Sequence, residues 1–287
     1  MSITRVLLAG FAIMGAGLTP LVAQTVDGFD HPESVFKEGN ALYVFNLGKE
    51  LKPSDKDGDG YISKLDLSGK VIDKRFLPKT GKLNAPKGMA AIGNVLYVTD
   101  VDRVIGFDLT SREQVFSVDV PGTVFLNDPV MIDARTLWVS ATDKNQLVRI
   151  DLDKKTAEFL PISGLNGPNG LTLSDDKKTV YNVGFGVDNK PNGTVVKIDV
   201  ASLKSERIGT YEGLLDGVYQ RGNKLYFSDW KSFGDTGELQ VLDLKSGQTA
   251  RATDVALIGG FADFLVDGNQ LIVPSLTNNK IIFTKFN

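Results

Sequence analysis

Apolar and polar positions alternate along most of the chain in short segments separated by turns. Segments such as "NQLVRIDL" (145–152) and "GTVVKIDV" (193–200) place apolar side chains at every second position, which is typical of half-buried strands. After about residue 23, no segment shows the 3.6-residue period of an amphipathic helix. The pattern therefore predicts an all-β protein.

Three patterns recur in the same order throughout the chain. An apolar strand such as "NVLYVTD" from Asn94 is followed by an alternating strand such as "DRVIGFDL". A short polar stretch precedes each apolar strand, in the forms "HPESV", "APKGM", "LNDPV", "GPNGL", "LLDGV" and "GFADF". The aspartate of the alternating strand recurs every 42–48 residues, at Asp66, Asp108, Asp151, Asp199 and Asp243. A period of roughly 40–50 residues with several short strands predicts a six-bladed β-propeller with four strands in each blade.

The final repeat ends at Asn287, directly after its third strand. We therefore expect the segment from about Gln24 to Asp30 to supply the outer strand of the last blade and to close the ring, which removes exposed sheet edges. Equivalent positions of the apolar strands are expected to be buried, namely Leu42, Leu96, Leu137, Val180, Leu225 and Leu271.

The first 23 residues resemble an export signal. Arg5 precedes the apolar run "VLLAGFAIMGAGL", and "LVA" before Gln24 resembles a cleavage site. The run is too short and too rich in glycine for a good membrane span, and no later segment is long and apolar enough. The sequence thus predicts a signal peptide over 1–23, a single propeller domain over 24–287, and a periplasmic or secreted protein.

Composition narrows the chemistry. The chain has 32 basic and 35 acidic side chains and shows no basic run, so nucleic-acid binding is not predicted. It has no cysteine and one histidine, His31, which excludes disulfides, thiolate chemistry and multi-histidine metal sites. Any metal would be held mainly by oxygen ligands, which favours Ca2+, with Mg2+ and Mn2+ as alternatives.

One acidic segment, "DKDGDGYISKLD" (55–66), has the ligand spacing of an EF-hand calcium loop. Its flanks predict strands rather than helices, and Asp66 is one of the aspartates that recur in five of the six repeats. The segment therefore predicts a hairpin between the second and third strands of the first blade. This hairpin is either a solvated acidic turn or a second calcium site that resembles those of integrin-type propellers. The candidate ligands of that site are Asp55, Asp57, Asp59 and Ser63.

The polar stretch before each apolar strand predicts a second candidate site. The innermost strands of a propeller begin around one central channel, so these stretches are expected to converge on the axis. They supply carboxylates, amides and one lysine: Glu33, Lys87, Asn127, Asp128, Asn169, Asp216 and Asp263. Such oxygens suit calcium, and a cation would offset the cost of burying carboxylates.

Here the chain resembles a known family. "GPNGLTLSDDKKTVY" and "LDGVYQRGNKLYFSDW" are similar to the metal-binding strand starts of the gluconolactonase/regucalcin-like (senescence marker protein) family, which is related to paraoxonases. "FLNDPV" and "HPESV" resemble two further strand starts of that family, and the similarity covers about residues 30–287. The resemblance implies metal ligands at Glu33, Asn169 and Asp216, a contact from Asn127 to metal-bound water or substrate, and Zn2+ as a further candidate ion.

The function that this resemblance implies is an exported, metal-dependent hydrolase of small-molecule lactones or related esters. The ion would polarise the carbonyl, and Asp216 would accept a proton from the attacking water. Asn127 would be the second catalytic residue, with Asp128 and Lys87 as substrate contacts. Lys87 would either bind an anionic substrate or pair with Glu33.

Other features leave alternatives open. Sugar lactonases of the family often carry an arginine where this chain has Phe125, so a polyol contact is missing. His31 is either a general base, as in paraoxonases, or a surface residue. Trp138 is interpreted as core and Trp230 as a contact at the rim. The alternative functions are a non-catalytic propeller that binds a ligand or a protein around a structural metal, and a metal-free enzyme of the strictosidine-synthase-like type.

Overall fold

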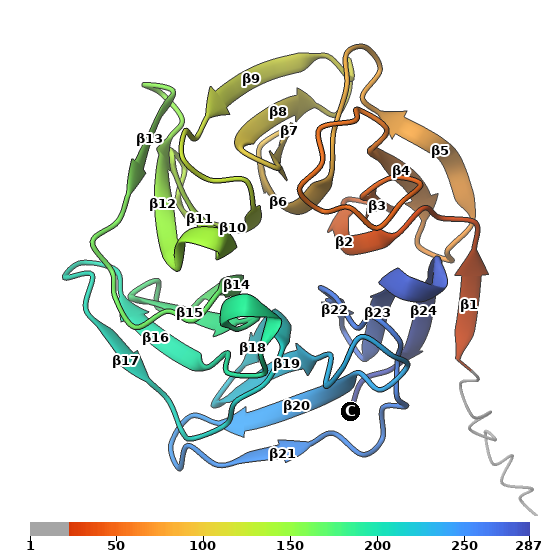
Figure 1. The fold of residues 1–287 in the computed structure, drawn as a ribbon. Helices are drawn as coiled ribbons and strands as arrows, with labels where there is room; N and C mark the ends of the chain where they lie inside the picture. Colours follow the sequence, from red (N-terminus) through yellow and green to blue (C-terminus); the bar gives the residue numbers. More distant parts are fainter. Residues whose placement is uncertain (1–22) are drawn as a thin grey trace, which may run out of the picture.

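The computed structural model describes residues 23–287, which form six four-stranded antiparallel sheets around a central channel (Figure 1). The predicted six-bladed, all-β propeller is confirmed. The signal peptide predicted over 1–23 lies, except for Ala23, outside the described residues. None of the helices within 23–287 has the length and hydrophobicity that a membrane span requires.

Each blade runs from an inner strand at the channel to an outer strand at the circumference. Blade 1 consists of β2 (Pro32–Glu38), β3 (Ala41–Asn46), β4 (Tyr61–Asp66) and β5 (Val71–Leu77). Blade 2 consists of β6 (Pro86–Ile92), β7 (Val95–Asp100), β8 (Arg103–Asp108) and β9 (Gln114–Asp119). Blade 3 consists of β10 (Leu126–Asp133), β11 (Thr136–Ala141), β12 (Gln146–Asp151) and β13 (Thr156–Phe159).

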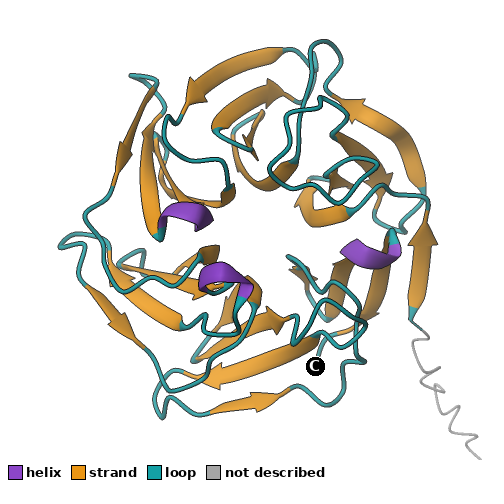
Figure 2. Ribbon diagram, in the orientation of Figure 1, coloured by secondary structure: helices purple, strands orange, loops and turns teal. Residues whose placement is uncertain are grey.

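The second half of the ring follows the same plan. Blade 4 consists of β14 (Pro168–Leu173), β15 (Thr179–Gly184), β16 (Val195–Asp199) and β17 (Ser205–Arg207). Blade 5 consists of β18 (Leu215–Arg221), β19 (Lys224–Asp229), β20 (Glu238–Asp243) and β21 (Thr249–Arg251). Blade 6 contains β22 (Leu265–Asp267), β23 (Gln270–Ser275) and β24 (Lys280–Lys285). Three short 3-10 helices border the channel (Figure 2): η1 (Thr142–Lys144), η2 (Val187–Asn189) and η3 (Leu276–Asn278).

The ring is closed by the first described strand. β1 (Gln24–Asp27) pairs antiparallel with β24, with Thr25 opposite Ile282, and so becomes the outermost strand of blade 6 (Figure 1). The predicted closure by the segment before Glu33 is therefore confirmed. The sixth sheet therefore has four strands, like the other five.

The hydrophobic core lies between successive blades. Tyr43 and Phe45 of blade 1, for example, pack in one cluster with Met89 and Leu96 of blade 2. Trp138 is buried in the cluster between blades 3 and 4, as expected. All six apolar positions predicted to be equivalent are fully buried: Leu42, Leu96, Leu137, Val180, Leu225 and Leu271.

The recurrent aspartate ends the third strand of five blades and shapes the turn that follows. Asp108 accepts hydrogen bonds from the backbone N–H groups of Thr110, at 3.0 Å, and Ser111, at 2.7 Å. Hydrogen bonds from Ser111 and Asn94 lower the pKa of Asp108. Asp66 accepts equivalent bonds from Ser68 and Lys70. Its place in the EF-hand-like spacing is therefore explained by this turn, in which an aspartate carboxylate binds backbone amides a few residues ahead.

Candidate functional site

A β-bulge opens the inner strand of each of the first five blades. The pairing register shifts between Pro32 and Ser34, and equivalent shifts occur at 86–89, 126–129, 168–171 and 215–218. A bulge re-aims the side chain at the irregularity. The residues inside the five shifts include every candidate taken from the polar stretches of these blades: Glu33, Lys87, Asn127, Asp128, Asn169 and Asp216.

Glycines beside these bulges let neighbouring blades approach closely. Gly88, Gly170 and Gly217 each follow a site residue directly. A Cβ at Gly88 would lie 2.7 Å from the Cα of Asp128, and one at Gly170 would lie 2.2 Å from the carbonyl oxygen of Asp216. Only glycine fits at such contacts. The Lys-Gly, Asn-Gly and Asp-Gly pairs of the sequence therefore lie at close contacts of the ring, inside the inner strands rather than in turns.

Buried hydroxyl groups link blades 1, 2 and 5 each to the next blade. Ser34 donates to the carbonyl oxygen of Lys87, and Thr99 donates to that of Asn127. Ser228 of blade 5 donates to the carbonyl oxygen of Ala262 over 2.9 Å. Because buried carbonyl groups are costly to leave unpaired, these contacts fix the backbone from which the site residues project.

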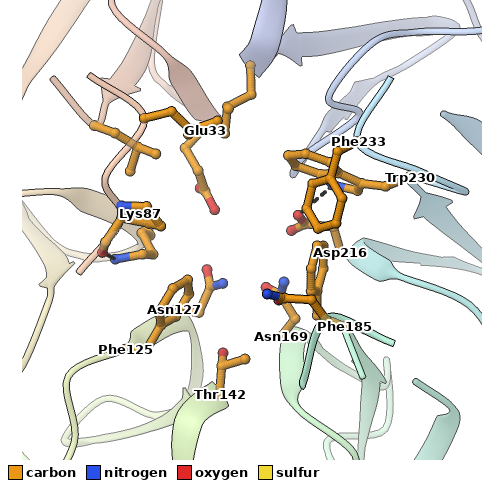
Figure 3. Close-up of a pocket in the computed structure, with 15 residues that line it drawn as sticks. Glu33, Lys87, Phe125, Asn127, Thr142, Asn169, Phe185, Asp216, Trp230 and Phe233 are labelled. Atoms are coloured by element: carbon orange, nitrogen blue, oxygen red, sulfur yellow. Dashed lines mark hydrogen bonds between the residues drawn. The ribbon is translucent and has the colours of Figure 1, made fainter. Parts of the chain in front are cut away.

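The site residues enclose a cavity of about 280 Å3 on the face that carries the three 3-10 helices. Five predicted residues line it: Glu33, Lys87, Asn127, Asn169 and Asp216. Figure 3 shows the oxygen-bearing side chains of Glu33, Asn127, Asn169 and Asp216 pointing into one space from four blades. All four are at least 95% buried. The predicted convergence of these side chains is thus present in the structure.

Two buried oxygens in the cavity wall lack a hydrogen-bond partner. Within residues 23–287, neither Glu33 Oε2 nor Asn169 Oδ1 accepts a hydrogen bond. A buried polar atom left unpaired costs free energy, so both oxygens fit a ligand that supplies positive charge or donor groups. Burial, followed by the charges of Asp216 and Asp263, raises the pKa of Glu33. Burial and Asp263 also raise the pKa of Asp216 to about 8.

Asp216 is oriented by a tryptophan. The indole Nε1 of Trp230 donates to Asp216 Oδ2 over 2.9 Å, and this bond opposes the rise in the pKa of Asp216. Trp230 was expected at the rim, but it is 6% exposed and forms part of the cavity wall. The sequence carried one signal for this role, since Trp230 follows the second strand of the same blade directly.

Lys87 binds the backbone rather than Glu33. Its Nζ donates to the carbonyl oxygens of Pro53, at 2.6 Å, and Ala85, at 3.2 Å. It also lies 4.6 Å from the ring centroid of Phe125. Among the described residues it forms no ion pair with Glu33, so the expected pairing is wrong, because loop carbonyl groups already satisfy the ammonium. Burial lowers the pKa of Lys87 to about 8.

Asp128 does not line the cavity, contrary to the expected substrate contact. Its Oδ2 accepts a hydrogen bond of 2.7 Å from the backbone N–H of Leu171, which ties blade 3 to blade 4. Asp263 of blade 6 lies outside the cavity wall as well and accepts a bond from its neighbour Phe264. Desolvation raises the pKa of both carboxyl groups, that of Asp263 to about 7. Neither carboxyl group faces the cavity.

His31 also lies outside the cavity wall, so the interpretation as a general base receives no support from its position. Its Nδ1 lies 3.0 Å from the carbonyl oxygen of Gly48, and its backbone adopts a positive φ of 52°. The side chain is half-buried in the loop before β2. A surface role fits this placement.

The acidic hairpin lies between β3 and β4, as predicted. Asp57 accepts a hydrogen bond from the backbone N–H of Asp59, and Asp59 accepts one from that of Lys49. Asp55 Oδ2 lies 3.7 Å from Lys52 Nζ. Ser63 does not join these carboxylates, because it is buried inside β4 and its hydroxyl donates to the carbonyl oxygen of Lys74. Its prediction as a calcium ligand is corrected accordingly.

No three acidic or histidine side chains within 23–287 lie close enough to hold a metal ion by themselves. A cation in the cavity would therefore need the amide oxygens of Asn127 and Asn169 beside the carboxylates of Glu33 and Asp216. Mixed carboxylate and amide ligands are ordinary for calcium.

No protein-family model matches the sequence, and no curated protein matches it either. Solved structures resemble it in fold. A virginiamycin B lyase from Staphylococcus aureus has a TM-score of 0.63 and 13% identity, over 93% of this chain and 99% of that one. Hydrazine synthase from Kuenenia stuttgartiensis has a TM-score of 0.60 and 18% identity, over 93% and 77%. A β-propeller domain of Cps50 (Swd1) from Myceliophteria thermophila has a TM-score of 0.60 and 11% identity, over 92% and 99%. At these identities the similarity shows the propeller fold alone.

Proposed function

We propose that the protein is an exported, cation-dependent hydrolase of lactones or related esters, with its active site in the cavity at the channel. One observation carries the proposal. The unpartnered oxygens Glu33 Oε2 and Asn169 Oδ1 line the same cavity as Asp216, whose carboxyl group is costly to ionise there. The resemblance of these strand starts to those of gluconolactonase-like proteins supports the same assignment.

The donor set fits a hard divalent cation. Glu33, Asn169 and Asp216 would hold it, and Asn127 would complete the set or contact the substrate. Ca2+ is favoured because carboxylate and amide oxygens are its usual ligands, with Mg2+, Mn2+ and Zn2+ as alternatives. When bound, such an ion would supply positive charge to polarise a carbonyl group.

Asp216 is proposed as the proton acceptor. Trp230 holds its Oδ2, and within residues 23–287 its Oδ1 receives no hydrogen bond. A water molecule beside this carboxylate would bond through its oxygen to the carbonyl carbon and pass one proton to Asp216. The carbonyl carbon–ring oxygen bond then breaks, and the leaving oxygen takes that proton. The products are an alcohol and a carboxylic acid in one molecule.

Asn127 is proposed to orient the substrate. Its side chain is 4% exposed and lines the cavity, and its backbone carbonyl accepts a hydrogen bond from Thr99, which fixes the backbone that carries the side-chain amide. An amide there can donate a hydrogen bond to a carbonyl oxygen that gains negative charge during attack.

The proposal is tested by titrating the metal-stripped protein with Ca2+, Mg2+, Mn2+ and Zn2+ in a calorimeter, and by assaying a lactone panel with and without chelator. Glu33→Gln and Asn169→Ala should weaken cation binding and turnover together. Glu158→Gln, on the outer strand β13, is the matched control. Cation binding without turnover of any lactone would favour the alternative of a non-catalytic binding propeller.

A further inference from the structure

The cavity has apolar as well as polar lining residues. Eight side chains form the apolar wall, from the loops of several blades: Leu47, Leu51, Pro53, Phe125, Phe185, Trp230, Phe233 and Leu276. Three aromatic rings in this wall contact one another. The ring centroids of Phe185 and Trp230 lie 5.6 Å apart, and the angle between the ring planes is 86°. Phe233 lies 6.2 Å from Phe185 and 5.9 Å from Trp230. The three rings form one cluster, which also appears at one side of the cavity in Figure 3.

Few polar groups remain to recognise a hydroxylated ligand. Among the described lining residues, Thr142 and Asn189 are the polar ones besides the five site residues. The hydroxyl of Thr142 already donates to the carbonyl oxygen of Pro168 over 2.7 Å. Lys87 is occupied by two backbone carbonyl groups. Once the oxygen-bearing site residues are engaged by the cation and the reacting carbonyl, a polyol entering the cavity would lose hydrogen bonds to water and find few groups to replace them.

Two apolar side chains of the wall remain open to solvent. Phe233 is 57% exposed and Leu51 is 44% exposed, although both line the cavity. They come from blade 5 and blade 1 and belong to loops rather than to strands. An exposed apolar surface continuous with a pocket is a common sign of ligand binding, because a ligand can remove it from water.

We propose that the site takes lactones or esters whose part away from the reacting carbonyl is an apolar chain or ring, and that it discriminates against sugar lactones. This inference rests on the proposed function for the identity of the reacting group. The apolar part would lie against Phe185, Trp230 and Phe233, with its carbonyl directed to Asn127 and Asp216. Substrate selection would thus be made by the aromatic cluster, and the chemistry by the oxygen-bearing residues.

Lactams test binding without hydrolysis. The probes are a δ-lactam with a pentyl substituent, unsubstituted δ-valerolactam and D-glucono-δ-lactam. Tryptophan fluorescence reports binding, because Trp230 lines the cavity and the other tryptophan, Trp138, is buried between blades. We expect the pentyl lactam to bind at least about tenfold more tightly than δ-valerolactam, and the gluconolactam to bind more weakly than either. Trp230→Phe should abolish the signal.

Variants assign the preference to the wall. Phe233→Ser should reduce the ratio of pentyl lactam to δ-valerolactam affinity by about fivefold or more. Ile72→Ser, which changes an apolar residue of β5 that is 58% exposed, should leave the ratio unchanged. Both changed residues are largely exposed, so the fold is expected to survive either change.

The outcomes separate this inference from the proposed function. The predicted order of lactam affinities supports the apolar site even if no lactone is hydrolysed, in which case the hydrolase proposal alone fails. Hydrolysis with glucono-δ-lactone as the best substrate overturns the apolar site and leaves the hydrolase standing. Equal lactam affinities, no binding of any lactam, or equal effects of Phe233→Ser and Ile72→Ser also overturn it.

Discussion

Trp230 donates its indole N–H to Asp216 Oδ2 over 2.9 Å, and the two side chains meet in the wall of the channel cavity. The contact joins the aromatic cluster to the oxygen-bearing residues. One side chain therefore contributes apolar surface for a ligand and also sets the direction of the carboxylate that is proposed to accept a proton. This coupling makes Trp230 a positioning residue.

Trp230→Phe keeps an aromatic ring but removes the donor. In the native protein the hydrogen bond from Trp230 lowers the pKa of Asp216. Without this bond, the variant is expected to have a higher pKa for Asp216. A hydrogen bond to a charged group contributes about 1.5–3 kcal/mol. The acidic limb of the pH profile of kcat/KM should move to higher pH. Trp138→Phe, in the core, should lower stability without moving that limb.

Stability of the cation-free protein should fall as the pH rises. Burial and Asp263 raise the pKa of Asp216 to about 8 from an ordinary value of 3.8. A pKa that is raised in the folded state means that the folded state binds the proton more tightly than the unfolded state. The contribution of Asp216 to the free energy of unfolding is therefore fully present below about pH 3.8 and is lost progressively as the pH rises toward 8. Melting temperatures in chelator at a series of pH values measure the slope, and Asp216→Asn should flatten it. An unchanged slope in this variant would contradict the assignment.

Glu33→Gln should have opposite effects on cation binding and on stability in chelator. Removal of a carboxylate ligand should weaken the channel cation by more than about tenfold, since even residues that only support a ligand contribute 10–100-fold. In chelator the variant should melt at a higher temperature than the wild type, because a buried carboxylate without a partner is destabilising. Calorimetric titration and melting curves measure the two effects. Equal cation affinity in Glu33→Gln and Glu158→Gln would rule out the ligand role.

The acidic hairpin should be separable from the channel. Asp57 and Asp59 accept hydrogen bonds from backbone amides, and neither side chain lines the cavity. Changing both to Asn is expected to leave channel cation affinity and lactone turnover intact. A loss of calcium-dependent stability in this double variant would identify the hairpin as a second, structural calcium site. Loss of turnover as complete as in Asp216→Ala would instead place the hairpin in the active site.

Gly170→Ala should damage the site through the packing of the ring. The added Cβ would meet the carbonyl oxygen of Asp216 at 2.2 Å, so blade 4 or blade 5 must shift. Overpacking of this kind costs about 1–3 kcal/mol, and a lower melting temperature with weaker cation binding is expected. Gly234→Ala is the control, because a Cβ there would meet only Ser232 Oγ, at 3.5 Å. Similar stability losses in the two variants would argue against the packing role.

The sequence was informative where local chemistry decides the structure. Strand alternation located the six blades, and the polar stretch before each apolar strand located Glu33, Asn169 and Asp216 at the channel. The sequence predicted side-chain partners and directions less well where they depend on a loop or on a β-bulge. Lys87 is bound by the carbonyl of Pro53, which lies in a long connection between two strands, and no pattern encodes that contact. Asp128 differs from Asn127 by one position, yet the bulge turns it away from the cavity.

The pairing of β1 with β24 has a consequence for how the ring opens. Glu33 of blade 1 and Asp216 of blade 5 stand on opposite sides of this seam, because blade 6 lies between them. A cation bound by the two carboxylates would connect blades 1 and 5 at the channel, while the pairing of β1 with β24 closes the ring at its circumference. A local opening that separates β1 from β24 would then also have to increase the distance between Glu33 and Asp216 at the channel. Hydrogen exchange at Thr25 and Val26, which lie on the outermost strand of blade 6, would thus report occupancy of the site.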